Sequence, residues 1–295
     1  MEVSIDRGEF IDRSCLSVMT LGDLLRRYRD TVSTKKRSHD NEKIILNAII
    51  GRDLASFQLD EISPAVFAAY RDERLSKVKP ATINRELGIL RHMFDVAFLE
   101  WDLPFPENPL ARIRKPRVSN KRSRRLPVEE EMALFQSAAR CRNKLMLPLI
   151  RLALLTGMRR GELLRIHVDH LDLERSLLLV PITKNGEPRT IPLLPEAAGL
   201  LRELNCERDG LLLPLTPHSV RHAWDRLVHR AGLTDLHFHD LRHEAISRFF
   251  ELGLSVPEVA LISGHKDFSQ LSRYTHMRAE NIVSKLQDLG QVLEA

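Results

Sequence analysis

Six polar residues in the second half of the chain stand out because the packing of apolar side chains does not account for them. Arginine binds phosphate oxygens bidentately and keeps its proton at neutral pH. Histidine and lysine can exchange protons, and an activated tyrosine hydroxyl can act as a nucleophile. Together these side chains could bind an anion and attack it. The six residues are Arg159, Lys184, His239, Arg242, His265 and Tyr274.

Each of these residues by itself also has an ordinary structural explanation. Arg159 could cap a helix or pair with Glu162, and Lys184 beside a hairpin turn could be a solvated charge. A histidine such as His239 is more often a satisfied surface or core residue than a catalyst. Tyr274 on a helix usually packs with its hydroxyl in water. Only the order and spacing of the six residues are therefore informative.

That order and spacing resemble those of the tyrosine recombinases of the phage-integrase family. Members carry an arginine in a TG-x-R motif, a lysine on a β-hairpin, an H-x-x-R motif, a G-H or G-W step and then a tyrosine. The segments TKNGEPRTIPL and HDLRHEAIS are also similar to the family's, and the similarity spans residues 126–280. The matching positions are Thr156-Gly157-Met158-Arg159, Lys184, His239-Asp240-Leu241-Arg242, Gly264-His265 and Tyr274.

The resemblance implies a phosphate site built from two arginines. Arg159 and Arg242 would hold the non-bridging oxygens of a DNA phosphate, where charge grows during in-line attack. His265 would add a hydrogen bond, and Glu162 and His243 would steady the arginines or the site. The residue before Gly264-His265 is a serine where many relatives have leucine, which we expect to alter packing rather than chemistry.

The resemblance also implies covalent catalysis by Tyr274. A phenol with a pKa of about 10 is a poor nucleophile at neutral pH, so His239 would act as base or orienting group. Lys184 would protonate the leaving 5′ oxygen. The product would be a 3′-phosphotyrosyl intermediate, which the 5′ hydroxyl of a partner strand attacks. The expected enzyme is a site-specific DNA recombinase that uses no metal, ATP or other cofactor.

The elements before this region predict a small helical bundle. Residues 1–18 are expected to be flexible. Thr20 can cap a first helix, and Ser63-Pro64 and Lys79-Pro80 suit the starts of later helices. Apolar residues at helical spacing predict four short helices within residues 19–110. The resemblance identifies this part with the family's core-DNA-binding domain.

A basic segment follows this bundle. Residues 111–125 contain eight lysines and arginines and no acid, together with Pro116. A run of like charges with a proline predicts an extended linker. It could be a solvated hinge or a strap that lies on DNA phosphates.

Residues 126–279 predict a catalytic domain that is mainly helical with one small antiparallel sheet. A buried helix over residues 145–155 is ended by Gly157, and the segment around Asn185-Gly186 reads as two short strands and a turn. The fold class is therefore α+β, an N-terminal helical bundle followed by this domain. A last helix over residues 280–295 carries an apolar stripe, which covers its own core or, as in relatives, packs into a neighbouring subunit.

Composition permits a DNA partner without demanding one, since the net charge is +5 and the pI is about 9.2. Three scattered cysteines show neither metal-ligand spacing nor a disulfide framework, and no secretory signal or membrane span is visible. We therefore expect a soluble, cytoplasmic, nucleoid-associated protein.

Double-stranded DNA is the expected partner, bound by a tetramer of this chain on two sites, with accessory DNA-bending proteins as a further class. Basic and amide side chains on polar helix faces could bind phosphates or bases, although such faces are equally often just solvated. The candidates are Lys35, Lys36, Asn84, Arg85, Arg91, Arg122, Arg124, Arg125 and Arg221.

Three other functions stay open at this level. A metal-dependent phosphohydrolase could use His239-Asp240 with His237, His243 and His265, but it leaves the arginines, lysine and tyrosine without roles. A DNA-binding accessory factor that has lost catalysis would show the same residues. A type IB topoisomerase shares the chemistry but would relax DNA without sequence preference.

Overall fold

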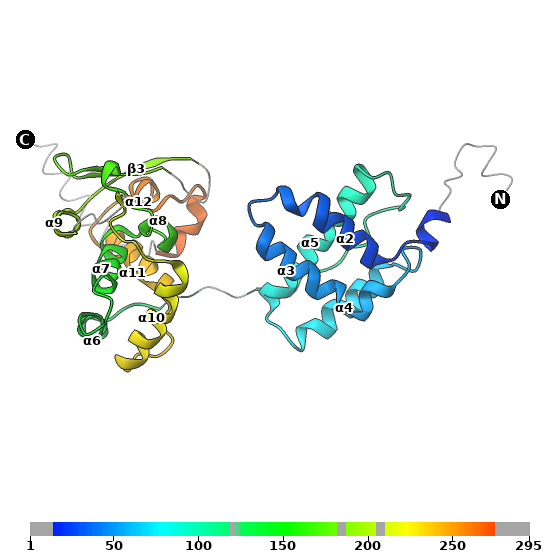
Figure 1. The fold of residues 1–295 in the computed structure, drawn as a ribbon, viewed down its shortest axis with the longest axis horizontal. Helices are drawn as coiled ribbons and strands as arrows, with labels where there is room; N and C mark the ends of the chain where they lie inside the picture. Colours follow the sequence, from blue (N-terminus) through cyan, green and yellow to red (C-terminus); the bar gives the residue numbers. More distant parts are fainter. Residues whose placement is uncertain (1–13, 119–121, 123, 182–186, 205–209, 275–295) are drawn as a thin grey trace, which may run out of the picture. The chain divides into compact units, whose positions relative to one another are not determined.

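A computed structural model describes residues 14–118, 122, 124–181, 187–204 and 210–274. The chain divides into two compact units, Met1–Lys121 and Arg122–Ala295, whose elements are labelled in Figure 1. Lys184, the Asn185-Gly186 turn, and the expected helix over residues 280–295 lie outside the described residues. The same holds for most of the N-terminal segment that was expected to be flexible.

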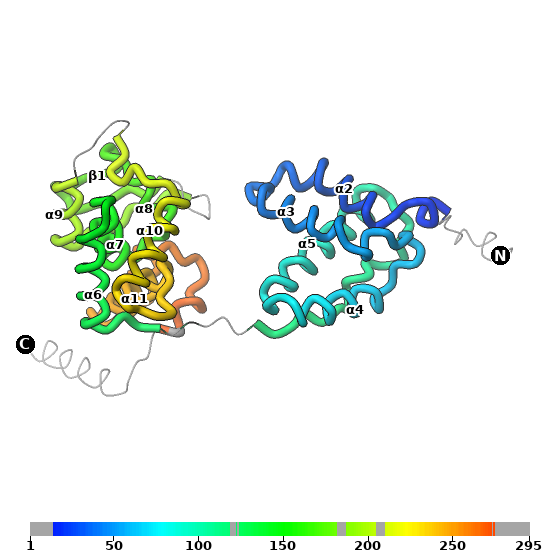
Figure 2. Tube along the Cα trace, turned by 60° about the horizontal axis from the view of Figure 1, so that its bottom comes forward, coloured from blue at the N-terminus to red at the C-terminus, as the bar shows by residue number. Residues whose placement is uncertain are grey.

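The first unit is the predicted helical bundle. Figure 2 shows its long helix α5 beside α2 and α4, with which it packs. Thr20 caps α2 through a reciprocal pair of hydrogen bonds with Asp23, and prolines occupy the first position of α4 and α5. The elements are η1 (Ser14–Ser17), α2 (Leu21–Thr31), η2 (Ser33–Lys35), α3 (His39–Ile50), η3 (Asp53–Ser56), α4 (Pro64–Leu75) and α5 (Pro80–Leu99).

The second unit is mainly helical with a small sheet, which confirms the predicted fold class. Its core is built around α7, which packs against α6, α9 and α11. The elements are α6 (Val128–Ala139), α7 (Met146–Thr156), α8 (Arg160–Leu163), η4 (Val168–His170), β1 (Leu171–Asp172), β2 (Leu177–Val180), β3 (Arg189–Pro192), α9 (Pro195–Glu203), α10 (Pro217–Arg230), α11 (Phe238–Glu251), α12 (Val256–Ser263), η6 (Phe268–Gln270) and η7 (Ser272–Tyr274).

The sheet is antiparallel in the order β1-β2-β3. β2 and β3 are the two predicted strands, paired from Leu177 opposite Pro192 to Val180 opposite Arg189. β1 was not predicted, because it is only two residues long and has no alternating pattern. On β3 the side chains of Arg189 and Ile191 share the inward face, since strand residues two apart point the same way.

Two glycines end the helices that lead into the candidate site. Gly157 follows α7 and Gly264 follows α12, with φ of 60° and 71° respectively. These left-handed conformations strain residues that carry a Cβ atom, so glycine suits both positions. Each turn carries a candidate residue just beyond it, Arg159 after the first glycine and His265 after the second.

The basic segment at residues 111–125, expected to be an extended linker, has no helix or strand among its described residues and is bonded to both folded units. Its first part lies on the N-terminal unit, where Arg71 donates to the carbonyl of Arg114 at 3.1 Å and Asn84 donates to that of Pro116 at 2.9 Å. Its last part, from Arg122, belongs to the second unit. Side chains of the first unit thus donate to the segment's carbonyls, and carboxylates of the second unit accept from its arginines, which composition alone does not reveal. Over the residues described, no helix is both long and apolar enough to cross a bilayer.

Candidate active site

Arg159 stands at the N-terminus of α8 and is held by Glu162. The backbone N–H of Arg159 donates to Glu162 Oε2 at 2.9 Å, and its guanidinium Nη1 lies 3.1 Å from Oε1. Nη2 points to the carbonyl of Gly264 at 3.4 Å. The side chain is about a quarter exposed, so one side of the guanidinium faces solvent. The pairing with Glu162 fits both the structural explanation of Arg159 and its expected role.

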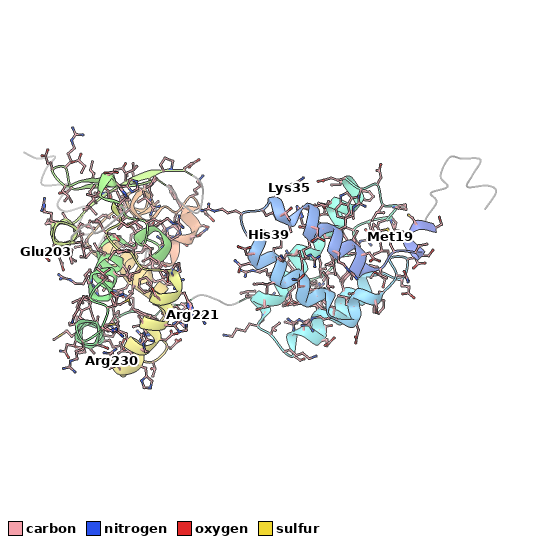
Figure 3. All side chains as sticks on the ribbon, in the orientation of Figure 1. Met19, Lys35, His39, Glu203, Arg221 and Arg230 are labelled. Carbon is pink, nitrogen blue, oxygen red and sulfur yellow. The ribbon has the colours of Figure 1, made fainter. Side chains whose placement is uncertain are left out.

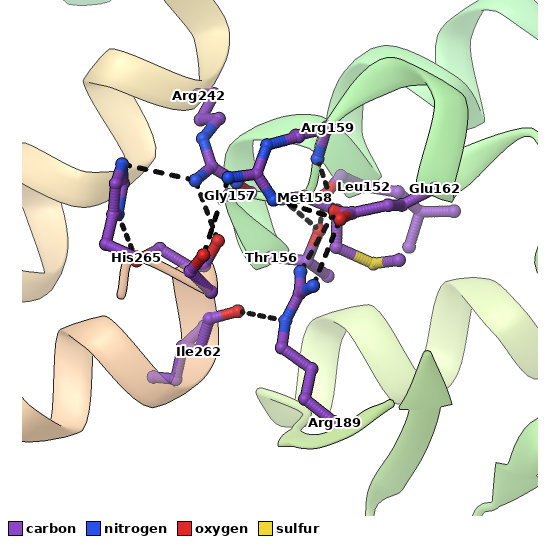
Figure 4. A network of polar contacts seen from close by, with 12 residues as sticks. Leu152, Thr156, Gly157, Met158, Arg159, Glu162, Arg189, Arg242, Ile262 and His265 are labelled. Carbon is purple, nitrogen blue, oxygen red and sulfur yellow. Dashed lines mark hydrogen bonds and ion pairs between the residues drawn. The ribbon is translucent and has the colours of Figure 1, made fainter. Parts of the chain in front are cut away.

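Arg242 is buried, with 3% of its surface exposed, and it donates to two backbone carbonyls. Nη1 lies 2.6 Å from the oxygen of Gly157, and Nη2 lies 2.7 Å from that of Ser263 and 3.4 Å from His265 Nε2. Figure 4 shows this arrangement beside Arg159. Burial and the charge of Arg159 lower the pKa of Arg242 to about 9, so it still carries its charge at neutral pH. None of the hydrogen-bond partners described for this cation is a carboxylate, although the charge of Glu162 also acts on it.

His265 is oriented by the serine that replaces the leucine common in relatives. Ser263 Oγ lies 2.7 Å from His265 Nδ1 and donates to the carbonyl of Val259 at 2.6 Å. Ser263 is fully buried, so the expectation that this position alters packing is incomplete. The hydroxyl also fixes the ring of His265, which places Nε2 beside Arg242.

Glu162 binds a second arginine, Arg189, which the motif comparison did not include. Arg189 Nη1 and Nη2 lie 3.0 and 2.9 Å from the two carboxylate oxygens, and its Nε donates to the carbonyl of Ile262 at 3.2 Å (Figure 4). Burial alone would raise the pKa of Glu162, but Arg189 and the backbone N–H of Arg159 lower it to about 2. The sequence did contain one indication of this role. Arg189 lies two residues before the apolar Ile191, so on a strand their side chains share one face.

Tyr274 ends the short helix η7 and packs over α11. Its hydroxyl contacts Nδ1 of His243, and the two rings are stacked with centroids 5.9 Å apart. The ring of Phe250 is also stacked with that of Tyr274, with the centroids 6.5 Å apart. His239 is exposed, and its ring meets that of His243 edge-on at 4.9 Å. His243, which was expected only to support the site, is thus the histidine that contacts the tyrosine.

The structure therefore brings five of the six candidate catalytic residues into one region of the second unit, and the sixth, Lys184, is not described. Beside them a cavity of about 630 Å³ is lined in part by Arg160, Arg221, His237 and His239. The lining also includes Asp225 and apolar side chains, and its two arginines are the groups that could contact an anionic ligand.

The candidate DNA-binding residues fall into two groups. Lys35, Arg85 and Arg221 are exposed, and Lys35 and Arg221 are labelled in Figure 3. The others have partners within the protein, and their contact with DNA stays a prediction. Lys36 donates to Glu42 at 2.8 Å, and the amide or guanidinium groups of Asn84, Arg91, Arg122, Arg124 and Arg125 bond backbone carbonyls or carboxylates.

Asp240, the carboxylate that the metal-site hypothesis needs, is bonded to other groups of the protein. Asp240 is buried and accepts hydrogen bonds from Arg122 at 2.9 Å and from the backbone of His237 at 2.8 Å. Among the residues described, no three His, Cys, Asp or Glu side chains are grouped closely enough to hold a metal ion.

Comparisons with known proteins cover both units. Residues 19–117 match the phage integrase N-terminal domain, and residues 124–281 match the phage integrase family. The shufflon-specific DNA recombinase of Escherichia coli is 40% identical over 277 residues, which are 91% of this chain and 72% of that protein. A putative integrase/recombinase of Haemophilus influenzae is 30% identical over 289 residues, 92% of this chain and 75% of the relative.

Solved structures share the fold. The Tn1549 transposon integrase in complex with a circular intermediate DNA has a TM-score of 0.76 at 16% identity, over 92% of this chain and 99% of that one. A lambda integrase tetramer bound to a Holliday junction has a TM-score of 0.72 at 21% identity, over 92% and 83%. The sequence matches favour a recombinase over the phosphohydrolase and the inactive accessory factor. The chain therefore belongs to the phage integrase family and is a tyrosine-type site-specific DNA recombinase.

Proposed function

We propose that the chain cleaves and rejoins double-stranded DNA through a 3′-phosphotyrosyl bond to Tyr274, without metal or ATP. The observation that carries the proposal is the buried guanidinium of Arg242, which lies beside Arg159 and has no carboxylate among the hydrogen-bond partners described. A buried charge is costly unless an opposite charge compensates it. A DNA phosphate between the two arginines would supply that charge.

In the proposed reaction the Tyr274 oxygen attacks the phosphorus, and the bond from phosphorus to the 5′ oxygen breaks. Arg159, Arg242 and His265 stabilise the charge that develops on the non-bridging oxygens. The phenol loses a proton and the 5′ oxygen gains one, for which Lys184 is the proposed donor. Religation reverses these steps with the 5′ hydroxyl of a partner strand, so the phosphodiester count is conserved.

Two histidines of α11 are candidates for the group that receives the phenol proton. His239 is the one that the family resemblance implies, and its exposed ring borders the cavity. His243 is the one whose Nδ1 contacts the hydroxyl in this structure. We propose that His243 holds the tyrosine before DNA binds and that His239 completes the site once DNA is present.

Exposed basic residues on both units supply proposed DNA contacts, with Lys35 and Arg85 on the first and Arg221 on the second. Phosphate contacts would make affinity fall steeply with salt. Because the lambda integrase structure contains a tetramer on a Holliday junction, we propose a tetramer on two DNA sites for this chain. The helix over residues 280–295 is the proposed subunit link, DNA-bending proteins are proposed helpers, and the site of action is the nucleoid in the cytoplasm.

A covalent-trapping assay tests the proposal. Labelled duplexes from the flanks of the native gene are incubated with protein in EDTA. Each duplex is nicked near a candidate site, so that cleavage releases a short fragment with a free 5′ hydroxyl, which diffuses away and cannot religate. Wild type is expected to give a protein–DNA adduct on a denaturing gel, and Tyr274→Phe is expected to bind equally and give none. Specific binding by wild type without an adduct would overturn the proposed chemistry. Nucleotide release that requires added metal would do the same.

A further inference from the structure

The end of the basic segment is bound to the helix that carries the catalytic histidines and arginine. Arg122 Nε and Nη2 each lie 2.9 Å from an oxygen of Asp240. Arg125 Nε lies 2.8 Å from Glu244 Oε2, and its Nη1 lies 2.8 Å from Glu251. All three carboxylates belong to α11. Two arginines from residues 122–125 thus hold one face of this helix, an arrangement that we call the arginine clasp.

Two of the three carboxylates of the clasp, Asp240 and Glu244, are buried and need partners, whereas the side chain of Glu251 is 56% exposed. Asp240 is 3% exposed and Glu244 is 2% exposed. Burial alone would raise the pKa of each group, but the arginines and backbone N–H groups keep both pKa values below the ordinary range. Removing one partner from a buried ion pair leaves an uncompensated charge, which is strongly unfavourable.

Backbone and side-chain bonds give the clasp a defined geometry. The N–H of Leu126 donates to Glu244 at 3.0 Å, directly after Arg125 in the chain. Arg248 donates to the same carboxylate at 2.9 Å and also binds Glu131 on α6. Asp240 accepts from the N–H of His237, at the start of α11. The helix is therefore fixed at its beginning and in its second turn.

The clasp and the active site occupy adjoining stripes of α11. Asp240 and Glu244 are four residues apart and lie on one face. Each directly follows a histidine of the site, His239 or His243, so the two stripes are about 100° apart around the helix axis. A small rotation of α11 that broke the clasp would also move both histidines and Arg242, whose hydrogen bonds to two carbonyls tolerate little displacement.

We infer that Arg122 and Arg125 are positioning residues that fix the catalytic helix α11, and that they are not contacts for DNA phosphates. The inference rests on the proposed function, because its effect is on the rate of cleavage at Tyr274. It also assigns Asp240 and Glu244, which stand inside and beside the H-x-x-R motif, to holding the helix. They are not proposed to touch DNA.

The test compares Arg122→Gln and Arg125→Gln with Arg112→Gln, a matched control at the start of the same basic segment. The side chain of Arg112 is 80% exposed, and its ion pair among the described residues is with the exposed Glu107. Three quantities are measured for each protein: DNA affinity against salt concentration, the rate of adduct formation at saturating protein, and urea unfolding. Both clasp variants are expected to form the adduct about tenfold or more slowly, with the slope of log affinity against log salt unchanged. Arg125→Lys, which keeps the charge, is expected to recover part of the rate.

Distinct results overturn the inference. A salt slope reduced by about one, with a normal rate at saturation, would show that the arginine neutralises a phosphate. A rate loss that follows only the unfolded fraction would reduce the clasp to a stabilising role. Glu244→Gln provides a second check, since it should slow cleavage like Arg125→Gln and the double variant should be no slower than either. If the wild type itself forms no adduct, the proposed function is wrong. If the wild type is active and the variants form the adduct equally fast, only the positioning role of the clasp is refuted.

Discussion

Replacing Glu162 by glutamine is expected to lower the free energy of unfolding of the catalytic unit by about 3 kcal/mol at neutral pH. The carboxylate is buried and pairs with both Arg159 and Arg189. Its pKa is about 2, against an ordinary value of 4.5. One pKa unit corresponds to about 1.4 kcal/mol, which gives this magnitude. Glutamine keeps the shape of the side chain and removes the charge.

The pH dependence identifies the cause. Because the pKa is lower in the folded state, the stabilisation is fully present above the unfolded value of 4.5 and is lost as pH falls towards 2. The difference between wild type and Glu162→Gln should therefore shrink by roughly half near pH 3. Urea unfolding is followed by fluorescence in a Trp101→Phe background, where Trp224, buried in the core of the second unit, is the sole tryptophan.

A matched control is Glu196→Gln in the same unit. Glu196 pairs with Arg151 at 2.7 Å, but its side chain is 57% exposed, so the cost should stay below about 1 kcal/mol. A difference for Glu162→Gln that stays constant between neutral pH and about pH 3 would refute the reasoning. In that case the attraction between the charge of Glu162 and the two arginines would not be the source of the stabilisation.

Three further outcomes are expected. His243→Gln should slow adduct formation about tenfold or more without changing DNA affinity, since it removes the group that contacts the nucleophile; an unchanged rate in single-turnover trapping, with His239→Gln as comparison, would contradict this. Gly264→Ala should destabilise the protein more than Gly232→Ala in urea unfolding. Both have positive φ, but a Cβ at Gly264 would lie 2.9 Å from a guanidinium, whereas at Gly232 nothing lies within 4 Å; equal costs would count against the close contact. Thr20→Ala should lower the free energy of unfolding of the first unit by about 1 kcal/mol, because it removes the N-cap of α2. Urea unfolding followed by the fluorescence of Trp101 measures this, and an unchanged stability would show that the capping box is not needed.

Local signals predicted most of the helices because caps and breakers act over a few residues. Thr20, Ser63-Pro64 and Lys79-Pro80 each stand at the start of a helix as expected, and Gly157 ends α7. The two-residue strand β1 was not predicted, because its pairing with β2 defines it and its own sequence has no strand pattern. The sheet and the α+β class were accessible from the hairpin segment alone.

The site was predictable where chemistry fixes both residue type and order, and less so where only packing does. Arg159, Arg242 and His265 come together as the motif implies. The partners of the clasp do not follow from any pattern, since Arg122 and Asp240 are 118 residues apart. A basic run looks the same in sequence whether its charges meet phosphates or buried carboxylates. Only the fold distinguishes those cases.

The two arginines of the proposed phosphate site are held by different kinds of negative charge. Arg159 depends on the carboxylate of Glu162, whereas Arg242 donates to carbonyls at the C-terminal ends of α7 and α12. A helix carries a partial negative charge of about half an elementary charge at that end. Two helix dipoles thus help to stabilise the buried cation through backbone carbonyls, which do not titrate. Acid would neutralise the carboxylate that binds Arg159 directly, whereas the two carbonyls that bind Arg242 have no charge to lose.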